Sequence, residues 1–315
     1  MSANDALRLA AFGFRVDLVT AEVTTQLREA GIPSILLKGP ALATWLYAGD
    51  ESRLYGDTDL LLRGSDWEAA IAVLRRLRFV DDLGPLAHPR MESGAGHPWT
   101  RPVDGAAVDL HRTLFGIGAD PEEVWTAFAA DAVGQRVGGA EVALPSHPAR
   151  LLHVALHAVQ HGGVPGTKAI ADLERAVAIV PVPTWQAARE LADRLDAAAS
   201  FAAGLQLTPG GDELAAAIGA RPAGSASSRL RLDGVPTAEG FHELSQTRGL
   251  GAKLALLRRE LFPAPEFMRW WSPLARRGRR GLLAAYGWRL VWLALRAGPG
   301  LRAWRRAARA EAPDR

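Results

Sequence analysis

Two aspartates separated by a single residue, Asp57 and Asp59, have the chemistry of a metal-binding pair. Three leucines follow them, so the pair stands at the start of a predicted buried strand. Residues two apart on a strand point to the same face, with their Cα atoms ~6.6–6.8 Å apart. Because Mg²⁺ prefers oxygen ligands and is usually held by one or two carboxylates together with substrate phosphates, the pair predicts a magnesium site, with Mn²⁺ as the alternative ion.

A third carboxylate, Asp109, lies inside another apolar segment, residues 106–111. An unpaired charge is costly in a buried strand, so we expect it to have a partner. If the two strands are neighbours, three carboxylates converge and can hold two metal ions ~3.5–4 Å apart. One ion would activate an attacking oxygen and the other would stabilise a leaving pyrophosphate. The alternative is that Asp57 and Asp59 cap a turn, while Asp109 pairs with a nearby arginine.

The elements that must position these acids alternate between helices and strands. Helical periodicity covers three segments, residues 5–30, 41–48 and 66–77. Strands are expected at 33–39 and 57–63, and a strand pair at 97–114. We expect Ser65 and Glu68 to form a capping box at the third helix. Residues 135–144 are typical of a hairpin that turns at Gly138 and Gly139.

From residue 146 onward the pattern becomes mostly helical. Helices are expected at 148–161, 168–179 and 184–199, and again from about residue 241. Residues 209–240 are rich in Gly, Pro, Ala and Ser, which predicts a connection holding one short helix. This order predicts an α/β (α+β) fold with a mixed sheet, followed by a helical region. The expected domains are a catalytic domain at 1–145, a helical domain at 146–260 and a basic tail at 261–315.

The composition is that of a folded protein and excludes several classes of site. Apolar residues make up 48% of the chain and charged residues 23%. The chain has no cysteine, which excludes disulfides, thiolate zinc sites and cysteine nucleophiles. The N-terminus lacks the pattern of a secretory signal, and no segment reaches the ~20 apolar residues of a spanning helix. We therefore expect a cytoplasmic protein.

Positive charge is concentrated at the C-terminal end. Residues 253–315 carry 15 Lys or Arg against four acids, a net charge of +11, so the preceding residues carry −8. Ten arginines and no acid lie between Arg276 and Arg309, and five of the ten tryptophans lie between Trp270 and Trp304. This pattern is typical of a helix on an anionic membrane surface, here the inner face. It also suits nucleic acid or the chain's own acidic body, and nucleic acid ranks last because no nucleic-acid module is recognised.

Several motifs, taken in order, resemble the uncharacterised nucleotidyltransferase family of the polymerase-β-like superfamily. They are Leu36-Leu37-Lys38-Gly39, Tyr47, Arg53, Asp57-x-Asp59-Leu, Val108-Asp109-Leu-His111, His153-x₃-His157-x₃-His161-Gly, Ala171-Asp172-Leu and Phe262-Pro-x-Pro. The likeness spans roughly residues 25 to 275. It implies a mixed sheet flanked by helices, two Mg²⁺ ions, and transfer of a nucleoside monophosphate from an NTP such as ATP to an acceptor, with release of pyrophosphate.

The same resemblance assigns roles to individual residues. Asp57 and Asp59 would bind metal, and Asp109 would complete the site and serve as a candidate base for the acceptor hydroxyl. Lys38 and Gly39 stand where the wider superfamily has Gly-Ser at the start of a helix. Helix N-termini bind phosphate through their backbone N–H groups, and Lys38 would add a point charge for the triphosphate.

Arg53 and four histidines complete the set of candidate residues. Arg53 is a candidate triphosphate ligand, and its structural alternative is a salt bridge to the first aspartate of the pair. His153, His157 and His161 form one stripe of a helix, spread over ~12 Å, which is too far for a single ion. We expect His153 to be a hydrogen-bonded core residue, and His157 and His161 to line a nucleotide or acceptor pocket. His111 is expected to orient Asp109 or to pack beside it.

Two other functions compete with nucleotidyl transfer. A glycosyltransferase also uses D-x-D to hold the metal of a nucleotide sugar, but such folds need a longer region before the motif than 56 residues and do not require Asp109. A non-catalytic nucleotide-binding protein on the same fold is the third hypothesis. The acceptor is not encoded in any motif, and polysaccharide precursors, peptides, proteins and RNA all remain candidates.

Overall fold

The computed structural model describes residues 3–47, 53–83, 96–220, 229–230, 234–235 and 237–311. Its described residues divide into two compact units, the first ending at residue 220 and the second beginning at residue 229. The finer boundary expected at residue 145 subdivides the first unit, and the one at 260 subdivides the second. Both of these finer boundaries stay predictions.

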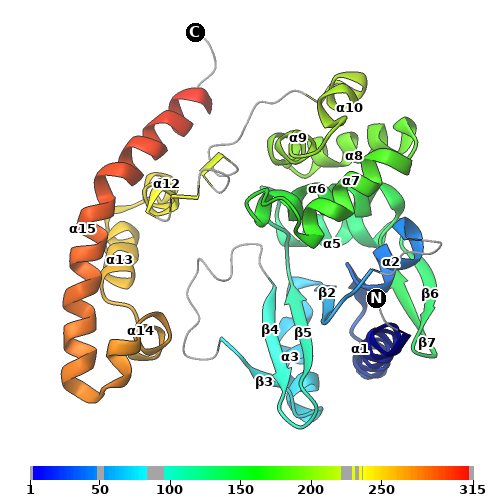
Figure 1. The fold of residues 1–315 in the computed structure, drawn as a ribbon, viewed down its shortest axis with the longest axis horizontal. Coiled ribbons are helices and arrows are strands. Elements are labelled where there is room, and N and C mark those ends of the chain that lie inside the picture. Colours follow the sequence, from blue (N-terminus) through cyan, green and yellow to red (C-terminus); the bar gives the residue numbers. More distant parts are fainter. Residues whose placement is uncertain are drawn as a thin grey trace. The chain divides into compact units, whose positions relative to one another are not determined.

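A mixed sheet forms the centre of the first unit (Figure 1). Among the described residues it has seven strands in the order β3-β4-β5-β2-β1-β7-β6. The strands are β1 Ser34–Leu36, β2 Thr58–Leu62, β3 Val80–Asp81, β4 His97–Arg101, β5 Ala106–His111, β6 Val133–Val137 and β7 Ala140–Leu144. Strand β1 runs antiparallel to β2 and parallel to β7, while β2 runs parallel to β5. The expected α/β class with a mixed sheet is therefore confirmed.

Helices cover both faces of this sheet. Those of the first unit are α1 Ala3–Glu29, α2 Pro40–Leu46, α3 Trp67–Arg76, α5 Pro121–Ala129, α6 His147–Gln160, α7 Lys168–Ile179, α8 Val182–Arg194, α9 Ala198–Leu205 and α10 Gly211–Ile218. Helices α6 to α9 pack together as a helical layer, and α1 and α3 pack against each other elsewhere in the unit (Figure 1). The strands thus lie between two helical groups.

The alternation of side chains along the strands sorts them into two cores. Ile35 and Leu61 belong to the core shared with α6, α8 and α9, whereas Leu36 and Leu60 belong to the core shared with α1 and α3. Successive strand residues point to opposite faces of a sheet, so Asp59 shares the face of Leu61. The site therefore opens toward the helical layer.

Two local expectations were wrong. The expected capping box at Ser65 is absent, because a 3₁₀ turn, Gly64–Asp66, precedes α3 and its N-cap makes no side-chain bond. A capping box is formed instead by Asp120 and Glu123 at the start of α5. The single helix expected at 184–199 is two, because Asp196 adopts a left-handed conformation with φ 50° between α8 and α9, a conformation that aspartate tolerates better than most residues.

The second unit is helical. It contains α12 Ala238–Gln246, α13 Leu250–Leu261, α14 Pro265–Trp271, the 3₁₀ turn η3 Pro273–Arg276 and α15 Gly278–Glu311. Two small clusters hold it together: Ala303 and Ala307 pack with Ala238, and Ala285 packs with Met268. None of the described helices combines the length and apolar character needed to cross a membrane. The core of this unit is therefore small compared with that of the first.

The packing of α9 against α6 generates a stability prediction. A Cβ atom on Gly204 would lie 2.5 Å from the carbonyl oxygen of Ala155, too close for the backbones to stay in place. We expect Gly204→Ala to lower the free energy of unfolding by about 1–3 kcal/mol, the usual cost of overpacking a core, as measured by urea unfolding.

Gly64 is the matched control in the same unit, because a Cβ there meets no atom within 4 Å. Gly64→Ala should leave the urea midpoint unchanged or raise it slightly. Equal behaviour of the two variants would contradict the close approach of α9 to α6.

Candidate active site

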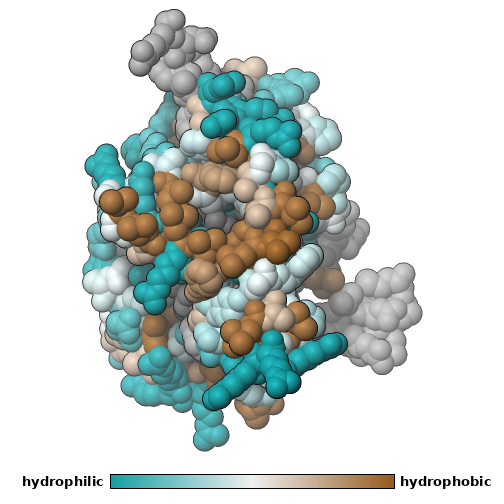
Figure 2. Space-filling model, turned by 90° about the vertical axis from the view of Figure 1, so that its left-hand side faces the viewer, coloured by the Kyte–Doolittle hydropathy of each residue, from teal (hydrophilic) through white to brown (hydrophobic). Residues whose placement is uncertain are grey.

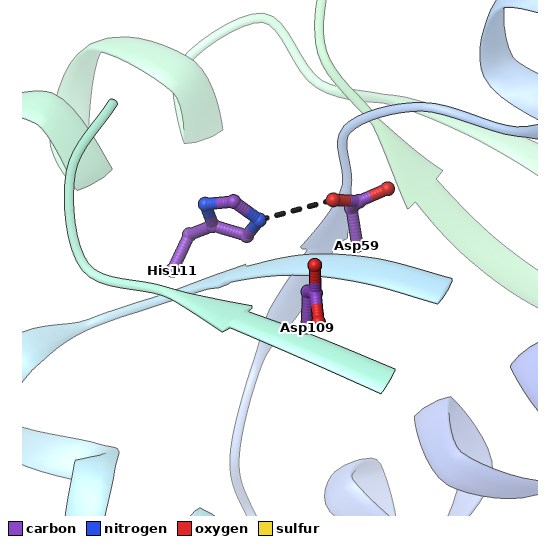
Figure 3. A group of neighbouring side chains, drawn as sticks. All are labelled: Asp59, Asp109 and His111. Atoms are coloured by element: carbon purple, nitrogen blue, oxygen red, sulfur yellow. Dashed lines mark hydrogen bonds and ion pairs between the residues drawn. The ribbon is translucent and has the colours of Figure 1, made fainter. Parts of the chain in front are cut away.

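Two aspartates face each other across neighbouring parallel strands. The register of β2 and β5 pairs Asp59 directly with Asp109. His111, two residues further along β5, points to the same face, and Figure 3 shows the three side chains gathered together. Ligand atoms of Asp59, Asp109 and His111 all lie within 4.8 Å of one another. The expected meeting of the second and third acids is therefore present in the fold.

Asp59 is held in a buried and asymmetric environment. Its Oδ1 accepts hydrogen bonds from Lys38 Nζ at 2.7 Å and from His111 Nε2 at 3.1 Å. Burial by itself would raise the pKa of the Asp59 carboxyl, but the charge of Lys38 and the bond from His111 hold this pKa far below its usual value. Asp59 is thus a carboxylate at neutral pH, and the lysine ammonium neutralises it.

Lys38 reaches this position because β1 continues to pair with β2 beyond its last residue. The Leu37 N–H donates to the carbonyl oxygen of Asp59 at 3.0 Å. The chain then turns at Gly39, whose φ of 62° lies in the left-handed region that glycine adopts at no steric cost. Pro40 begins α2 directly afterwards. The Lys-Gly turn therefore delivers the ammonium to the edge of the site.

Among the residues that the structure describes, Asp109 has no such neutralising partner. Burial, followed by the charge of Asp59, raises the pKa of the Asp109 carboxyl to about 6. Asp57 lies one residue before β2 and is partly exposed, and its charge also acts on Asp109 and Lys38. The strand begins one residue later than expected, so Asp57 stands at the entrance of the site and does not belong to the tight cluster.

The donor set of this cluster fits a divalent cation. Asp59 Oδ2 is buried and has no hydrogen-bond partner among the described residues, and His111 Nδ1 has none either. A buried acceptor without a partner costs free energy, and a cation bound between the two carboxylates would satisfy it. Carboxylate oxygens suit Mg²⁺ or Mn²⁺.

Gly96 was not singled out from the sequence, yet its backbone lies against the site. A Cβ at this position would lie 2.7 Å from both Asp109 Cβ and His111 Nε2. A glycine just before a strand is a weak signal by itself, which is why the sequence did not point to it. Its small size leaves room for the imidazole of His111.

Arg53 pairs with a helix of the helical layer. Its Nε and Nη2 donate to the two carboxylate oxygens of Asp172 on α7 at 2.8 and 2.7 Å. The hydroxyl of Tyr47 donates to the same carboxylate at 2.8 Å. Arg53 therefore forms a salt bridge, as the structural alternative expected, but its partner is Asp172 and not Asp57. Arg53 and Asp172 are separated by 119 residues, so no sequence spacing indicates their contact.

The histidine stripe on α6 begins beside the site. His153 is buried, and the backbone of Leu37 is among the groups that act on its ring. It is thus a core residue as expected, while its hydrogen bond stays a prediction. Burial and the nearby Lys38 lower the pKa of His153 to about 3 and place the pKa of His157 well below its usual value. His157 is partly buried and its ring centroid lies 4.5 Å from that of His161, which is exposed. The stripe therefore runs from the core to the surface.

A family profile described as "Uncharacterised nucleotidyltransferase" matches residues 9–209. The chain belongs to this family. The match covers the sheet with its three candidate acids, the helical layer and most of the first unit, and it ends before the second unit, whereas the likeness in the sequence was drawn to residue 275. Membership of the family therefore supports a transferase, and the acids of the sheet form a candidate metal site.

Among solved structures, the chain is similar to an antigenic nucleotidyltransferase-like protein from Paracoccidioides brasiliensis. The likeness covers 65% of this chain and 93% of that chain, at 15% sequence identity and a TM-score of 0.34. This level is too low to carry residue roles from one chain to the other. No curated protein gives a significant match.

The buried Arg53–Asp172 pair generates the first site prediction. Removing one partner of a buried ion pair leaves the other charge uncompensated, which costs about 3–5 kcal/mol. We expect Asp172→Asn to lower the free energy of unfolding toward that range in urea titrations. The control is Asp193→Asn on α8, whose pair with Arg189 is partly exposed and should contribute below about 1 kcal/mol. Equal losses would show that the Arg53 pair is screened by solvent.

His153 generates a pH-dependent prediction. Its pKa is lowered on folding, so its contribution to stability is complete above the unfolded value near 6.5 and is lost as the pH falls toward the folded value of about 3. Between pH 7.5 and pH 5 the wild type should lose about 2 kcal/mol more stability than His153→Gln. Urea unfolding at the two pH values measures the difference. The control His242→Gln, in the second unit, should follow the wild type.

Proposed function

We propose that this chain is a metal-dependent nucleotidyltransferase, which transfers a nucleoside monophosphate from an NTP to a hydroxyl or phosphate acceptor and releases pyrophosphate. The observation that carries the proposal is that Asp59 and Asp109 lie opposite each other on neighbouring strands. The buried Oδ2 of Asp59 has no hydrogen-bond partner among the described residues. Membership of the nucleotidyltransferase family supports the same reaction class. It also favours this reaction over transfer of a sugar from a nucleotide sugar.

In this proposal the three acids hold the divalent ions. Asp59 and Asp109 would bind through the facing carboxylates, and Asp57 would bind from the entrance of β2. When bound, Mg²⁺ or Mn²⁺ supplies the charge that offsets developing negative charge on the phosphates. Asp109 accepts the proton of an acceptor hydroxyl, as the family resemblance implies.

The cationic residues are proposed to bind the triphosphate. Lys38 forms an ion pair with Asp59, so an ion bound by Asp59 would release the lysine ammonium for the phosphates. Gly39, at the start of α2, would add its backbone N–H as a donor to the phosphates. Arg53 is held at Nε and Nη2 by Asp172, which fixes its guanidinium next to the segment that enters β2. A fixed cation needs no reorganisation when charge develops on the leaving group.

The imidazoles are proposed to complete the substrate pocket. His111 lies beside both acids and would orient them. His157 and His161 extend away from the site along α6 and would contact the nucleotide base or the acceptor. The acceptor itself stays open among a polysaccharide precursor, a peptide, a protein and an RNA.

The reaction is tested with Mg²⁺ or Mn²⁺ and each α-³²P-labelled NTP, together with a cell extract as the source of acceptor. We expect labelled acceptor and released pyrophosphate from at least one NTP. Asp59→Asn and Asp109→Asn should each lower the labelling rate by roughly 10²–10³-fold, the usual effect of removing a group that stabilises transition-state charge.

Asp131→Asn is the control, because this acid is exposed and lies outside the site, and its labelling should equal that of the wild type. Labelling that survives at both site variants would exclude the mechanism. If no NTP gives product, the binding of Mn²⁺ and of NTP is titrated instead. A non-catalytic binding protein would bind both in the wild type and neither in Asp59→Asn. Absence of binding in the wild type would show that the site is incorrect.

A further inference from the structure

Helix α15 packs both small residues and some large ones, such as Arg289 and Tyr286, on its inner side, and it leaves several large apolar residues exposed. Its buried positions include Gly281, Ala285, Ala303 and Ala307. Its exposed large apolar side chains are Leu283 at 72%, Trp288 at 52%, Leu290 at 37%, Val291 at 49% and Leu295 at 70% exposed. A surface helix of a globular protein normally has the opposite arrangement. The outer face of α15 is therefore apolar where water would favour polar side chains.

These exposed side chains lie on one side of the helix. Leu283, Trp288, Val291 and Leu295 fall within an arc of about 140° at 100° per residue and extend over ~18 Å of helix axis. Single exposed apolar residues need no explanation, but a contiguous patch marks a binding surface. We call this set the outer stripe of α15.

Arginines flank the outer stripe at both ends. Those before it are Arg276, Arg277, Arg279 and Arg280, those after it are Arg302, Arg305, Arg306 and Arg309, and all eight are exposed. No acid occurs from residue 267 to residue 310. The four later arginines also line a surface hollow with Val235 and Pro299. Figure 2 views the side of the molecule where α15 lies, and brown side chains gather across its middle with teal clusters above and below.

We propose that α15 lies flat on an anionic lipid bilayer, with the outer stripe in the headgroup–acyl boundary and the flanking arginines on lipid phosphates. An apolar patch with a tryptophan, together with arginines, is a feature that such helices share. The helix is not apolar enough to span a membrane, so it rests in the interface. Each arginine near an anionic surface adds to binding, and salt weakens this part.

Charge and shape together favour lipid over the other occupants. The phosphates of a nucleic acid would pair with the arginines, but they would offer no apolar contact to Leu283, Val291 and Leu295. Docking on the chain's own acidic body would suit the arginines as well, and it is one outcome of the test below. A bilayer with anionic headgroups satisfies the apolar centre and both basic ends at once.

The test is flotation of the full-length protein with vesicles of phosphatidylglycerol and phosphatidylcholine, compared with vesicles of phosphatidylcholine alone. We expect flotation with the anionic vesicles, weaker flotation with the neutral ones, and a loss in high salt. Asp59→Asn should float like the wild type, so a failure of the proposed reaction and a failure of membrane binding are distinguishable.

Two variants examine the two parts of the surface. The double variant Leu283→Ser, Leu295→Ser removes apolar contacts and should weaken partitioning at least roughly tenfold. Its control is Leu250→Ser on α13, a residue 75% exposed and outside α15. The triple variant Arg302→Gln, Arg305→Gln, Arg309→Gln should also lose at least roughly tenfold. Its control is the same change at three exposed arginines of the first unit, Arg76, Arg136 and Arg194.

Circular dichroism shows whether the variants keep their helices. The proposal is overturned if the wild type does not float with anionic vesicles, or if a site variant and its control float equally. Retention of a labelled RNA without flotation would assign the surface to nucleic acid. Faster hydrogen exchange on the first unit in the Leu283/Leu295 variant, again without flotation, would assign it to the protein's own body.

Discussion

The facing carboxyl groups of Asp59 and Asp109 are the constraint on which the rest of the site depends. Parallel pairing of β2 and β5 places them opposite each other, and burying two like charges side by side costs free energy. The fold offsets this cost differently for the two acids. Lys38 and His111 contact the carboxyl of Asp59, whereas the pKa of the Asp109 carboxyl rises to about 6. On the same face, the next position of β2 is the buried Leu61. The charged residue thus stands directly before the apolar run of β2.

The helical layer determines how strongly these charges interact. Helix α6 covers the face that carries the acids and contributes the buried His153, on which the charges of Lys38 and Asp59 act. Around them lies the larger apolar core, which includes α6, α8 and α9. A low local dielectric strengthens each hydrogen bond and makes each unpaired polar atom more costly. The unpartnered oxygen of Asp59 is therefore an unsatisfied acceptor, which a bound cation would satisfy.

Sequence periodicity predicted the elements of the first unit well, because strands with two-residue alternation and helices with apolar stripes are local patterns. The hairpin at Gly138 and the helix over 168–179 lie where they were expected. The convergence of Asp59 with Asp109 followed from a stated condition, that their strands are neighbours. The family resemblance, which rests on ordered motifs, was confirmed by the match over residues 9–209.

Features that depend on distant contacts could not be predicted in the same way. The partner of Arg53 lies 119 residues away, and although Asp172 belongs to a family motif, the sequence does not show which residue it contacts. The break at Asp196 is a single left-handed residue within a helical pattern. The exposure of the outer stripe of α15 could not be predicted from periodicity either. The pattern places apolar and small residues on different faces of the helix, but it does not show which face packs against the protein.

The contact between Arg53 and Asp172 has a consequence for how related chains can differ. The pair is buried and bidentate, and Tyr47 shares its carboxylate. A change at either position alone strands a charge in the interior, while an exchange of both for apolar residues of similar volume would keep the stability but lose the cation proposed to bind the triphosphate. Substitutions at these two positions are therefore expected to occur together. Homologous chains should keep the arginine and the aspartate together or lose them together.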